Sequence, residues 1–128
     1  MSSTVIEVVR NVTVTDRDID DIMSCALDGG ICYWCKEANV VGEYLGEYAS
    51  DQISRGGKLE LVPYDDDAQV IDKEDILRGI KICLEDVFLN YDLIEEKDGK
   101  LLLNCLNVDG SVADAIVQCA AFGSNVYG

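Results

Sequence analysis

Three segments of the chain each continue from a polar start with apolar side chains at helical spacing. Thr15 and Asp72 are helix-capping residues, Asp18 stands at the capping-box position three residues after Thr15, and Asp109-Gly110-Ser111 opens the third segment. An apolar side chain at every third or fourth position predicts a helix that buries one face. The helices are expected at residues 16–28, 73–89 and about 110–122.

Short runs outside these helices alternate apolar and polar residues, as half-buried strands do. The runs are residues 4–14, 59–63 and 101–108, with a hairpin turn at 97–100. Pro63 indicates a sheet edge, because proline cannot donate a ladder hydrogen bond. Residues 40–55 have mostly helical spacing, although Gly42 and Gly46 weaken that prediction.

The pattern as a whole predicts an α+β fold, with three or four helices packed on a small, mainly antiparallel sheet. The chain has 128 residues and contains no repeat, linker or low-complexity tract. A chain of that length can bury enough surface to fold alone. We therefore expect one domain over residues 1–128.

Charge limits the partners that the chain can have. Twenty-five carboxylates stand against ten Lys and Arg residues, for a formal net charge of −15. Such a surface repels nucleic acid and membranes and attracts basic proteins. General solubility is the alternative reason for the acidity, and helix capping or a solvated loop explains some of the acids locally. The carboxylates expected to face a basic partner are Asp16, Asp18, Asp20, Asp21, Glu43, Glu47, Asp65, Asp66 and Asp67.

Six aromatic side chains lie near these acids in the sequence. Tyr and Trp are favoured at interface hot spots, although most such residues belong to cores. An acidic face with aromatic anchors would suit a basic protein surface. The six residues are Tyr33, Trp34, Tyr44, Tyr48, Tyr64 and Tyr127.

The chain has no histidine, which removes the commonest general base and the usual partner of a nucleophilic Ser or Cys. We therefore expect a binding protein and not an enzyme. No apolar run approaches the length of a membrane helix, and residues 1–4 lack the features of a secretory signal. A cytoplasmic location is expected, and the six cysteines are then reduced thiols or metal ligands.

Cys32 and Cys35 form the sharpest local motif, a Cys-x-x-Cys pair whose two sulfurs can bind one metal ion. Cys105 and Asp109 are the residues best placed to complete a zinc site. Two alternatives remain open: a redox-active pair, although the motif follows a helix instead of starting one, and ordinary buried thiols. Cys83 lies in the apolar stripe of its helix and is expected in the core.

Several segments together resemble a family of small acidic proteins of phages and prophages. They include Thr15-Asp16, Tyr33-Trp34-Cys35, the stretch Val40 to Ser50, Ile53 to Gly57, and a tail that ends in Val126-Tyr127-Gly128. The resemblance covers nearly the whole chain. The family includes a zinc-containing anti-CRISPR protein from a streptococcal prophage, which inhibits a type II RNA-guided nuclease.

The resemblance implies a function that the charge permits. A type II nuclease holds its guide–target heteroduplex in a basic channel, which an acidic domain can occupy. The chain would then block target-DNA loading in the host bacterial cytoplasm by steric and electrostatic occlusion, with a structural zinc ion as cofactor. The alternative is a small prophage regulatory protein, or a redox protein that uses Cys32 and Cys35.

Overall fold

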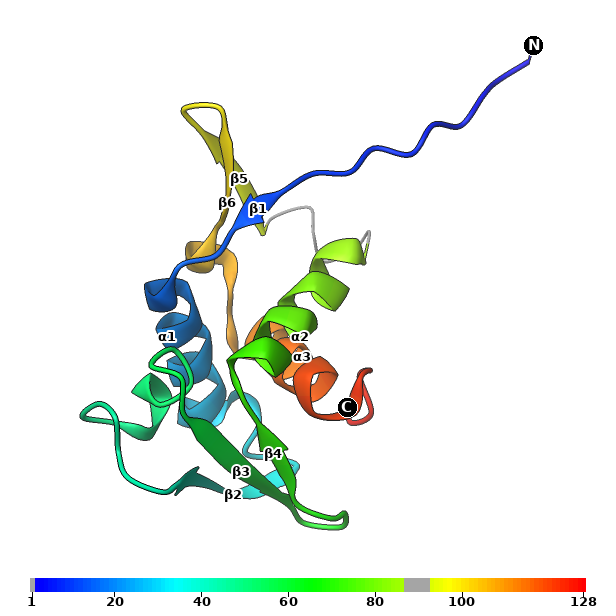
Figure 1. Ribbon diagram of the computed structural model, residues 1–128. Coiled ribbons are helices and arrows are strands. Elements are labelled where there is room, and N and C mark those ends of the chain that lie inside the picture. The colour runs from blue at the N-terminus through cyan, green and yellow to red at the C-terminus, as the bar shows by residue number, and fades with distance from the viewer. Residues whose placement is uncertain (1, 87–92) are drawn as a thin grey trace.

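Three α-helices form within the three segments that the sequence predicts to be helical. In the computed structural model, which describes residues 2–86 and 93–128, they are α1 (Asp16–Cys25), α2 (Lys73–Glu85) and α3 (Gly110–Phe122) (Figure 1). Thr15 and Asp72 each close a capping box, and Asp109 accepts a hydrogen bond from the Val112 amide. A π-helical turn (Ala26–Gly30) continues α1. The expected end of the second helix at residue 89 lies outside the described residues.

The strands divide into two small sheets instead of the single sheet that was expected. One has the order β1-β6-β5 and the other β2-β3-β4 (Figure 1). β1 pairs with β6 in parallel, and the other pairs are antiparallel. The strands are β1 (Val12–Thr13), β2 (Cys35–Val41), β3 (Lys58–Pro63), β4 (Gln69–Ile71), β5 (Ile94–Lys97) and β6 (Lys100–Leu103). The fold class is α+β, as the sequence predicts.

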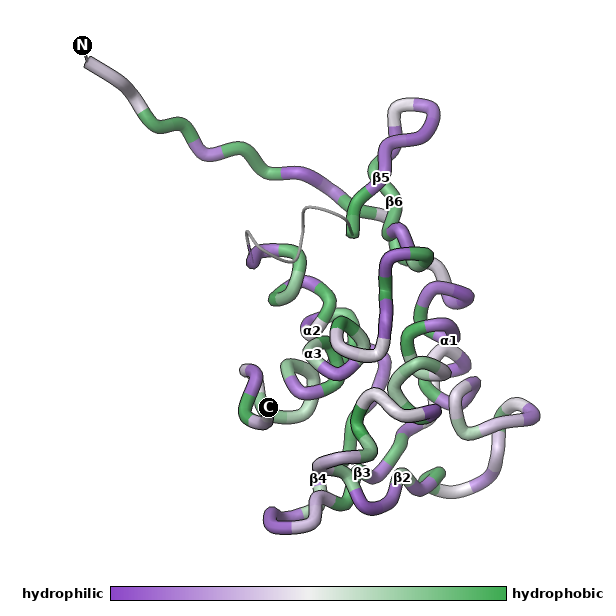
Figure 2. Tube along the Cα trace, turned by 180° about the vertical axis from the view of Figure 1, so that it is seen from behind, coloured by the Kyte–Doolittle hydropathy of each residue, from purple (hydrophilic) through white to green (hydrophobic). Residues whose placement is uncertain are grey.

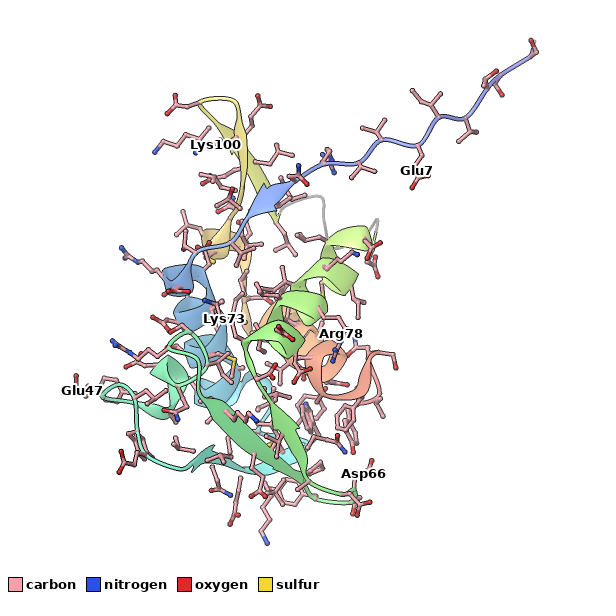
Figure 3. All side chains as sticks on the ribbon, viewed as in Figure 1. Glu7, Glu47, Asp66, Lys73, Arg78 and Lys100 are labelled. Atoms are coloured by element: carbon pink, nitrogen blue, oxygen red, sulfur yellow. The ribbon has the colours of Figure 1, made fainter. Side chains whose placement is uncertain are left out.

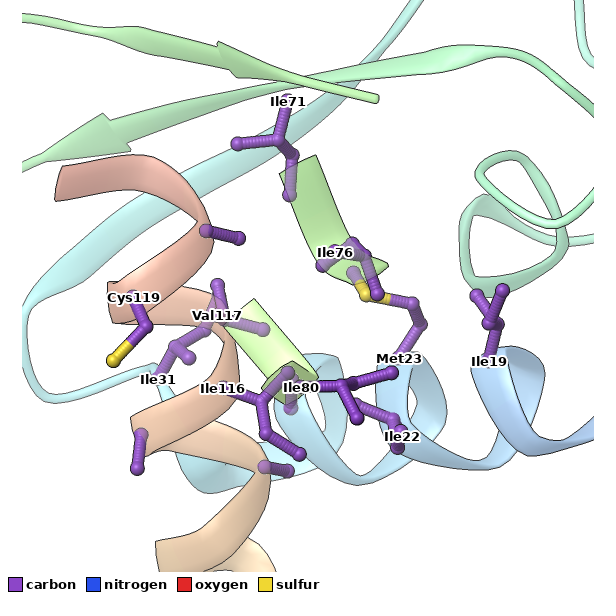
Figure 4. Packing of buried hydrophobic residues seen from close by; sticks show 14 of the residues in the cluster. Ile19, Ile22, Met23, Ile31, Ile71, Ile76, Ile80, Ile116, Val117 and Cys119 are labelled. Atoms are coloured by element: carbon purple, nitrogen blue, oxygen red, sulfur yellow. The ribbon is translucent and has the colours of Figure 1, made fainter. Parts of the chain in front are cut away.

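One cluster of buried apolar side chains joins the helices to the sheet β2-β3-β4. Figure 4 shows Met23 of α1, Ile76 of α2 and Ile116 of α3 in this cluster, each 0% exposed. Gly79 lets α2 and α3 approach closely, since a Cβ there would lie 2.4 Å from the Ile116 carbonyl oxygen. The apolar side chains of β3 alternate inward, so that Leu59 and Leu61 are fully buried. α3 lies deepest, since all its residues from 113 to 120 are buried.

The helix expected within residues 40–55 is wrong. β2 runs to Val41, an exposed loop follows, and a 3-10 helix covers only Ala49–Asp51. Gly42 has φ +78°, a left-handed conformation that glycine adopts without strain and that ends the strand. Helical spacing misled here because the spaced side chains include Tyr44 and Tyr48, which are exposed and have no core face to cover.

The strand expected over residues 4–14 shrinks to β1. Only Val12 and Thr13 find ladder partners, on β6, while residues 2–11 are exposed and project from the body (Figures 1 and 2). We call residues 2–11 the arm. Its apolar side chains include Val5, which is 94% exposed. High strand propensity gives no strand without a partner for the backbone.

Two smaller strand predictions also change. β3 is the central strand of its sheet, and Pro63 stands at its end opposite Cys35, where the register is irregular. Proline is tolerated there because the regular ladder has already stopped. The last strand ends at Leu103, and Cys105–Asn107 forms a 3-10 turn. The hairpin turn at residues 97–100 is confirmed, with Asp98 and Gly99 at positive φ.

No helix within the described part of the chain is long and apolar enough to cross a membrane.

Candidate functional site

The nine carboxylates expected to face a partner lie in three separate places. Four lie on the first turns of α1, which we call the helix group: Asp16, Asp18, Asp20 and Asp21. Glu43 and Glu47 lie on the exposed loop of residues 42–48, which we call loop 42–48. Asp65, Asp66 and Asp67 lie in the turn between β3 and β4, which we call the turn group. Figure 3 shows Glu47 and Asp66 on opposite sides of the molecule, so the nine residues form no single face.

Two members of the helix group have structural partners that reduce their availability. Asp18 closes the capping box with Thr15, and Asp20 accepts a hydrogen bond from the buried Ser54. Both are half-buried. Asp16 is exposed but forms an ion pair with Lys73 at 2.8 Å. The exposed Asp21 is the member of this group with the fewest such constraints in the described contacts.

The loop and turn carboxylates are exposed as expected. Glu43, Glu47, Asp65 and Asp67 all lie at the surface. Asp66 is also exposed, and it accepts a hydrogen bond of 2.7 Å from the Tyr127 hydroxyl. The carboxylates of loop 42–48 and of the turn group therefore face solvent.

Cys32 lies on the turn that joins the π-helical segment to β2, and Cys35 is the first residue of β2. The Cys35 amide donates to the Ile31 carbonyl at 2.8 Å, which closes the turn. The Cys32 side chain is exposed, whereas Cys35 is buried and its thiol contacts the Glu37 carbonyl at 3.1 Å. Burial raises the pKa of the Cys35 thiol. The buried Cys35 is therefore a poor nucleophile, but the exposed Cys32 would be the attacking thiol of a redox pair, so the redox alternative stays a prediction.

Cys105 and Asp109 are occupied elsewhere. The Cys105 thiol contacts the Asp18 carboxylate at 3.3 Å, near the start of α1. Burial, followed by the contact with Asp18, raises the pKa of Cys105 to about 12. Asp109 caps α3 through the Val112 amide. Neither residue contacts the Cys32–Cys35 turn in these described interactions.

The four predicted zinc ligands therefore do not form one site. The Cys105 sulfur lies 3.9 Å from the Asp18 carbonyl oxygen, and the Cys32 sulfur lies 3.7 Å from the Leu27 carbonyl oxygen. Nine helical residues separate those carbonyls by about 13 Å, which leaves at least about 6 Å between the two sulfurs. Two Zn–S bonds of about 2.3 Å span no more than about 4.6 Å. Within residues 2–86 and 93–128, no group of three or more metal-ligating side chains is arranged to hold a metal ion.

The most densely hydrogen-bonded carboxylate described is one that sequence reasoning did not select. Asp114 on α3 is 9% exposed and accepts hydrogen bonds from three side chains. The donors are the Tyr33 hydroxyl at 2.6 Å, the Trp34 indole N–H at 2.7 Å and the Gln118 amide at 2.8 Å. The signal was present in the sequence, since Asp114 and Gln118 stand four residues apart in an otherwise apolar helix.

The tail after α3 packs onto this same network. The Gln118 side-chain oxygen accepts hydrogen bonds from the Val126 and Tyr127 amides, both at 2.7 Å. The Tyr127 ring stacks on Trp34, with a centroid distance of 5.1 Å and an interplanar angle of 7°. Tyr127 is half-buried and packs against the core. Because its buried polar groups are paired with one another, the network stabilises the fold and leaves few groups free for chemistry.

Comparison with known proteins gives no match: no family model fits the chain, and neither the curated proteins nor the solved structures include one with significant similarity.

Proposed function

We propose that this chain inhibits a type II RNA-guided nuclease by binding its basic DNA channel and blocking the loading of target DNA. The observation that carries the proposal is a net charge of −15 on 128 residues, with carboxylates exposed in the loop and turn groups. A nuclease channel that binds phosphates also binds a compact acidic surface, and the two ligands then compete. The resemblance to phage proteins supports the choice of nuclease. Inhibition by occupancy needs no catalytic residue.

The test is a cleavage assay in which the order of addition is varied. Several type II nucleases, each loaded with guide RNA, receive the purified chain either before or after the target DNA. We expect inhibition when the chain is added first and little inhibition when the DNA is already bound. The inhibition should weaken as salt rises, because exposed charges are screened beyond about 8 Å at physiological ionic strength.

A charge-reduced variant provides the matched control. Asp65→Asn with Asp67→Asn removes two exposed charges and leaves the hydrogen bond between Tyr127 and Asp66 in place. Weaker inhibition with an unchanged melting temperature supports an electrostatic contact. Equal inhibition whether the chain is added before or after DNA would rule out blocked loading, and no inhibition of any nuclease would rule out the function.

Zinc is proposed as a cofactor only through Cys32 and Cys35, since the Cys105 sulfur lies too far from the Cys32 sulfur to bind the same ion and the Asp109 carboxylate caps α3. We expect elemental analysis of the protein purified with zinc to show less metal in the double variant Cys32→Ser, Cys35→Ser. Cys105→Ser is the control and should leave the zinc content unchanged, because its sulfur contacts Asp18 instead. A zinc content that falls only in the Cys105 variant would contradict this assignment.

A further inference from the structure

Loop 42–48 combines two features: large exposed aromatic side chains and a backbone that a buried side chain holds in place. Tyr44 is 60% exposed, Tyr48 is 61% exposed and Leu45 is 49% exposed. Glu43 and Glu47 are exposed on the same loop, and Figure 3 shows Glu47 at its outer end, away from the core. Tyrosine is enriched among the residues that contribute most to binding where proteins contact one another.

A buried glutamine fixes the loop. The Gln52 side chain is 1% exposed, accepts a hydrogen bond from the Leu45 amide at 2.9 Å and donates one to the Glu43 carbonyl at 3.0 Å. Gly57 leaves room for it, since a Cβ there would lie 2.5 Å from the Gln52 side-chain nitrogen. Its two hydrogen bonds lock the backbone on both sides of Tyr44. The loop therefore loses little conformational freedom when it binds.

The segment after the loop is anchored to the body. Ile53 is 0% exposed in the core, and the Ser54 hydroxyl donates to Asp20 of α1. Asp51 accepts a hydrogen bond from the Tyr48 amide at 3.3 Å, which fixes the far end of the loop. Both ends of the loop thus have defined positions, and the tyrosines extend from a rigid platform.

Building on the proposed function, we propose that loop 42–48 is the specific contact with the basic partner, with Tyr44 and Tyr48 stacking on arginine side chains. A guanidinium group stacks on an aromatic ring, and the neighbouring Glu43 and Glu47 attract its charge. Arginine fits this surface better than lysine, because the planar guanidinium stacks flat while the ammonium group is compact and strongly hydrated. The helix and turn groups then supply general attraction, whereas the loop supplies specificity.

The chain offers a closely matched control residue. Tyr64 is also 60% exposed and directly precedes the carboxylates of the turn group, and Figure 3 shows Asp66 of that group on the opposite side of the molecule from Glu47 of loop 42–48. The test variant is Tyr44→Ser with Tyr48→Ser, and the control variant is Tyr64→Ser. Both remove only exposed rings, so both should keep the wild-type melting temperature. Tyr44→Phe with Tyr48→Phe keeps the rings and should bind like the wild type.

Two immobilised probes are used: an arginine-rich peptide and a lysine-rich peptide of equal length and charge. We expect the wild type to bind the arginine peptide more tightly, by about two- to fivefold for each stacked ring. That preference should disappear in the Tyr44→Ser, Tyr48→Ser variant and persist in Tyr64→Ser. Equal affinity of the wild type for the two peptides, or a preference that survives loss of both rings, would overturn the proposal.

The same variants are then titrated against a guide-loaded type II nuclease. Loss of at least about tenfold in affinity from the double variant, with Tyr64→Ser near wild type, supports the loop as the contact. If the wild type inhibits the nuclease and the double variant inhibits it equally, the loop proposal fails while the proposed function stands. If the wild type binds no nuclease but keeps a ring-dependent arginine preference, the proposed function fails and the loop proposal stands.

Discussion

Asp114 brings three side-chain donors onto one buried carboxylate, and the tail of the chain depends on the same group of residues. Tyr33, Trp34 and Gln118 donate to it, while Gln118 also holds the backbone of Tyr127. A carboxylate buried in this way is tolerable because each oxygen is paired. Loss of its charge should therefore weaken several contacts at once.

We expect Asp114→Asn to lower the free energy of unfolding by about 1–2 kcal/mol, because hydrogen bonds to a charged acceptor are stronger than those to a neutral one. Urea unfolding followed by Trp34 fluorescence measures the change. Asp28→Asn is the control, since Asp28 is exposed and lines the same surface pocket as Asp114, and it should shift stability by less than about 0.5 kcal/mol. An unchanged midpoint for Asp114→Asn would show that the network contributes no net stability.

Tyr127 gives the fold a dependence on high pH. Its hydrogen bond to Asp66, together with desolvation and the negative charge of Asp66, raises the pKa of Tyr127 to about 12. The folded state thus keeps the phenol proton after the unfolded chain has lost it, at a pKa near 10. Stability from this contact is complete below about pH 10 and is lost as the pH rises towards about 12.

Tyr127→Phe should flatten that loss, because phenylalanine keeps the stacked ring but has no proton to release. The measurement is the urea midpoint at several pH values from neutral to strongly alkaline, with Tyr64→Phe as the control tyrosine. A wild-type slope that persists in Tyr127→Phe would assign the dependence to other groups.

At the scale of elements, α2 and α3 are held together by a close backbone approach. A Cβ on Gly79 would lie 2.4 Å from the Ile116 carbonyl oxygen and 3.0 Å from the Ala120 amide nitrogen. Neither contact can be relieved by turning a side chain. The two helices would have to separate.

Gly79→Ala tests this contact, because the close approach and helix propensity change the free energy of unfolding in opposite directions. In an exposed helix, replacing glycine with alanine stabilises by about 1 kcal/mol. Here we expect a net loss of at least about 1 kcal/mol, because overpacking at the backbone costs about 1–3 kcal/mol or more. Lys81→Ala on the same helix is the exposed control and should stay within about 0.5 kcal/mol. A stabilised Gly79→Ala protein would contradict the close packing, as measured by urea unfolding.

The elements that could be predicted from sequence are those whose signals are local. Thr15, Asp72 and Asp109 mark the three helix starts because a capping side chain bonds to an amide only a few residues away. Residues 40–55 and 4–14 were mispredicted because their structure depends on distant partners. The first segment takes its shape from the buried Gln52, and the second lacks ladder partners outside β1 among the described residues.

In the candidate site too, features with local signals could be predicted and features that depend on distant partners could not. Exposure of Glu43, Glu47 and the turn group was predictable, since charged residues in short connections face water. The pairing of Cys105 with Asp18, and the distance that separates it from Cys32, come from the packing of the turn Cys105–Asn107 beside α1. Ligand spacing in the sequence holds no information on that packing.

At the scale of the whole molecule, the net charge of −15 acts against compactness. Like charges on one small surface repel, and salt shortens the range of that repulsion from about 30 Å at 10 mM to about 8 Å at 150 mM. We expect the melting temperature to rise when sodium chloride is raised over that range. The Asp65→Asn, Asp67→Asn variant should show a smaller rise, and a melting temperature that falls with salt would indicate that ion pairs such as Lys73–Asp16 dominate instead.

The exposed arm offers a site for attaching a fluorescent label. A fluorophore attached through a cysteine introduced at Ser3, in a variant whose exposed Cys32 is replaced by serine, would sit up to about 25–30 Å from β1, given about 3.3 Å of reach per extended residue. Labelling there would leave the acidic loops and the packed helices untouched. Energy transfer from that dye to a labelled binding partner would then report how the two molecules are oriented, with no probe placed in the contact itself.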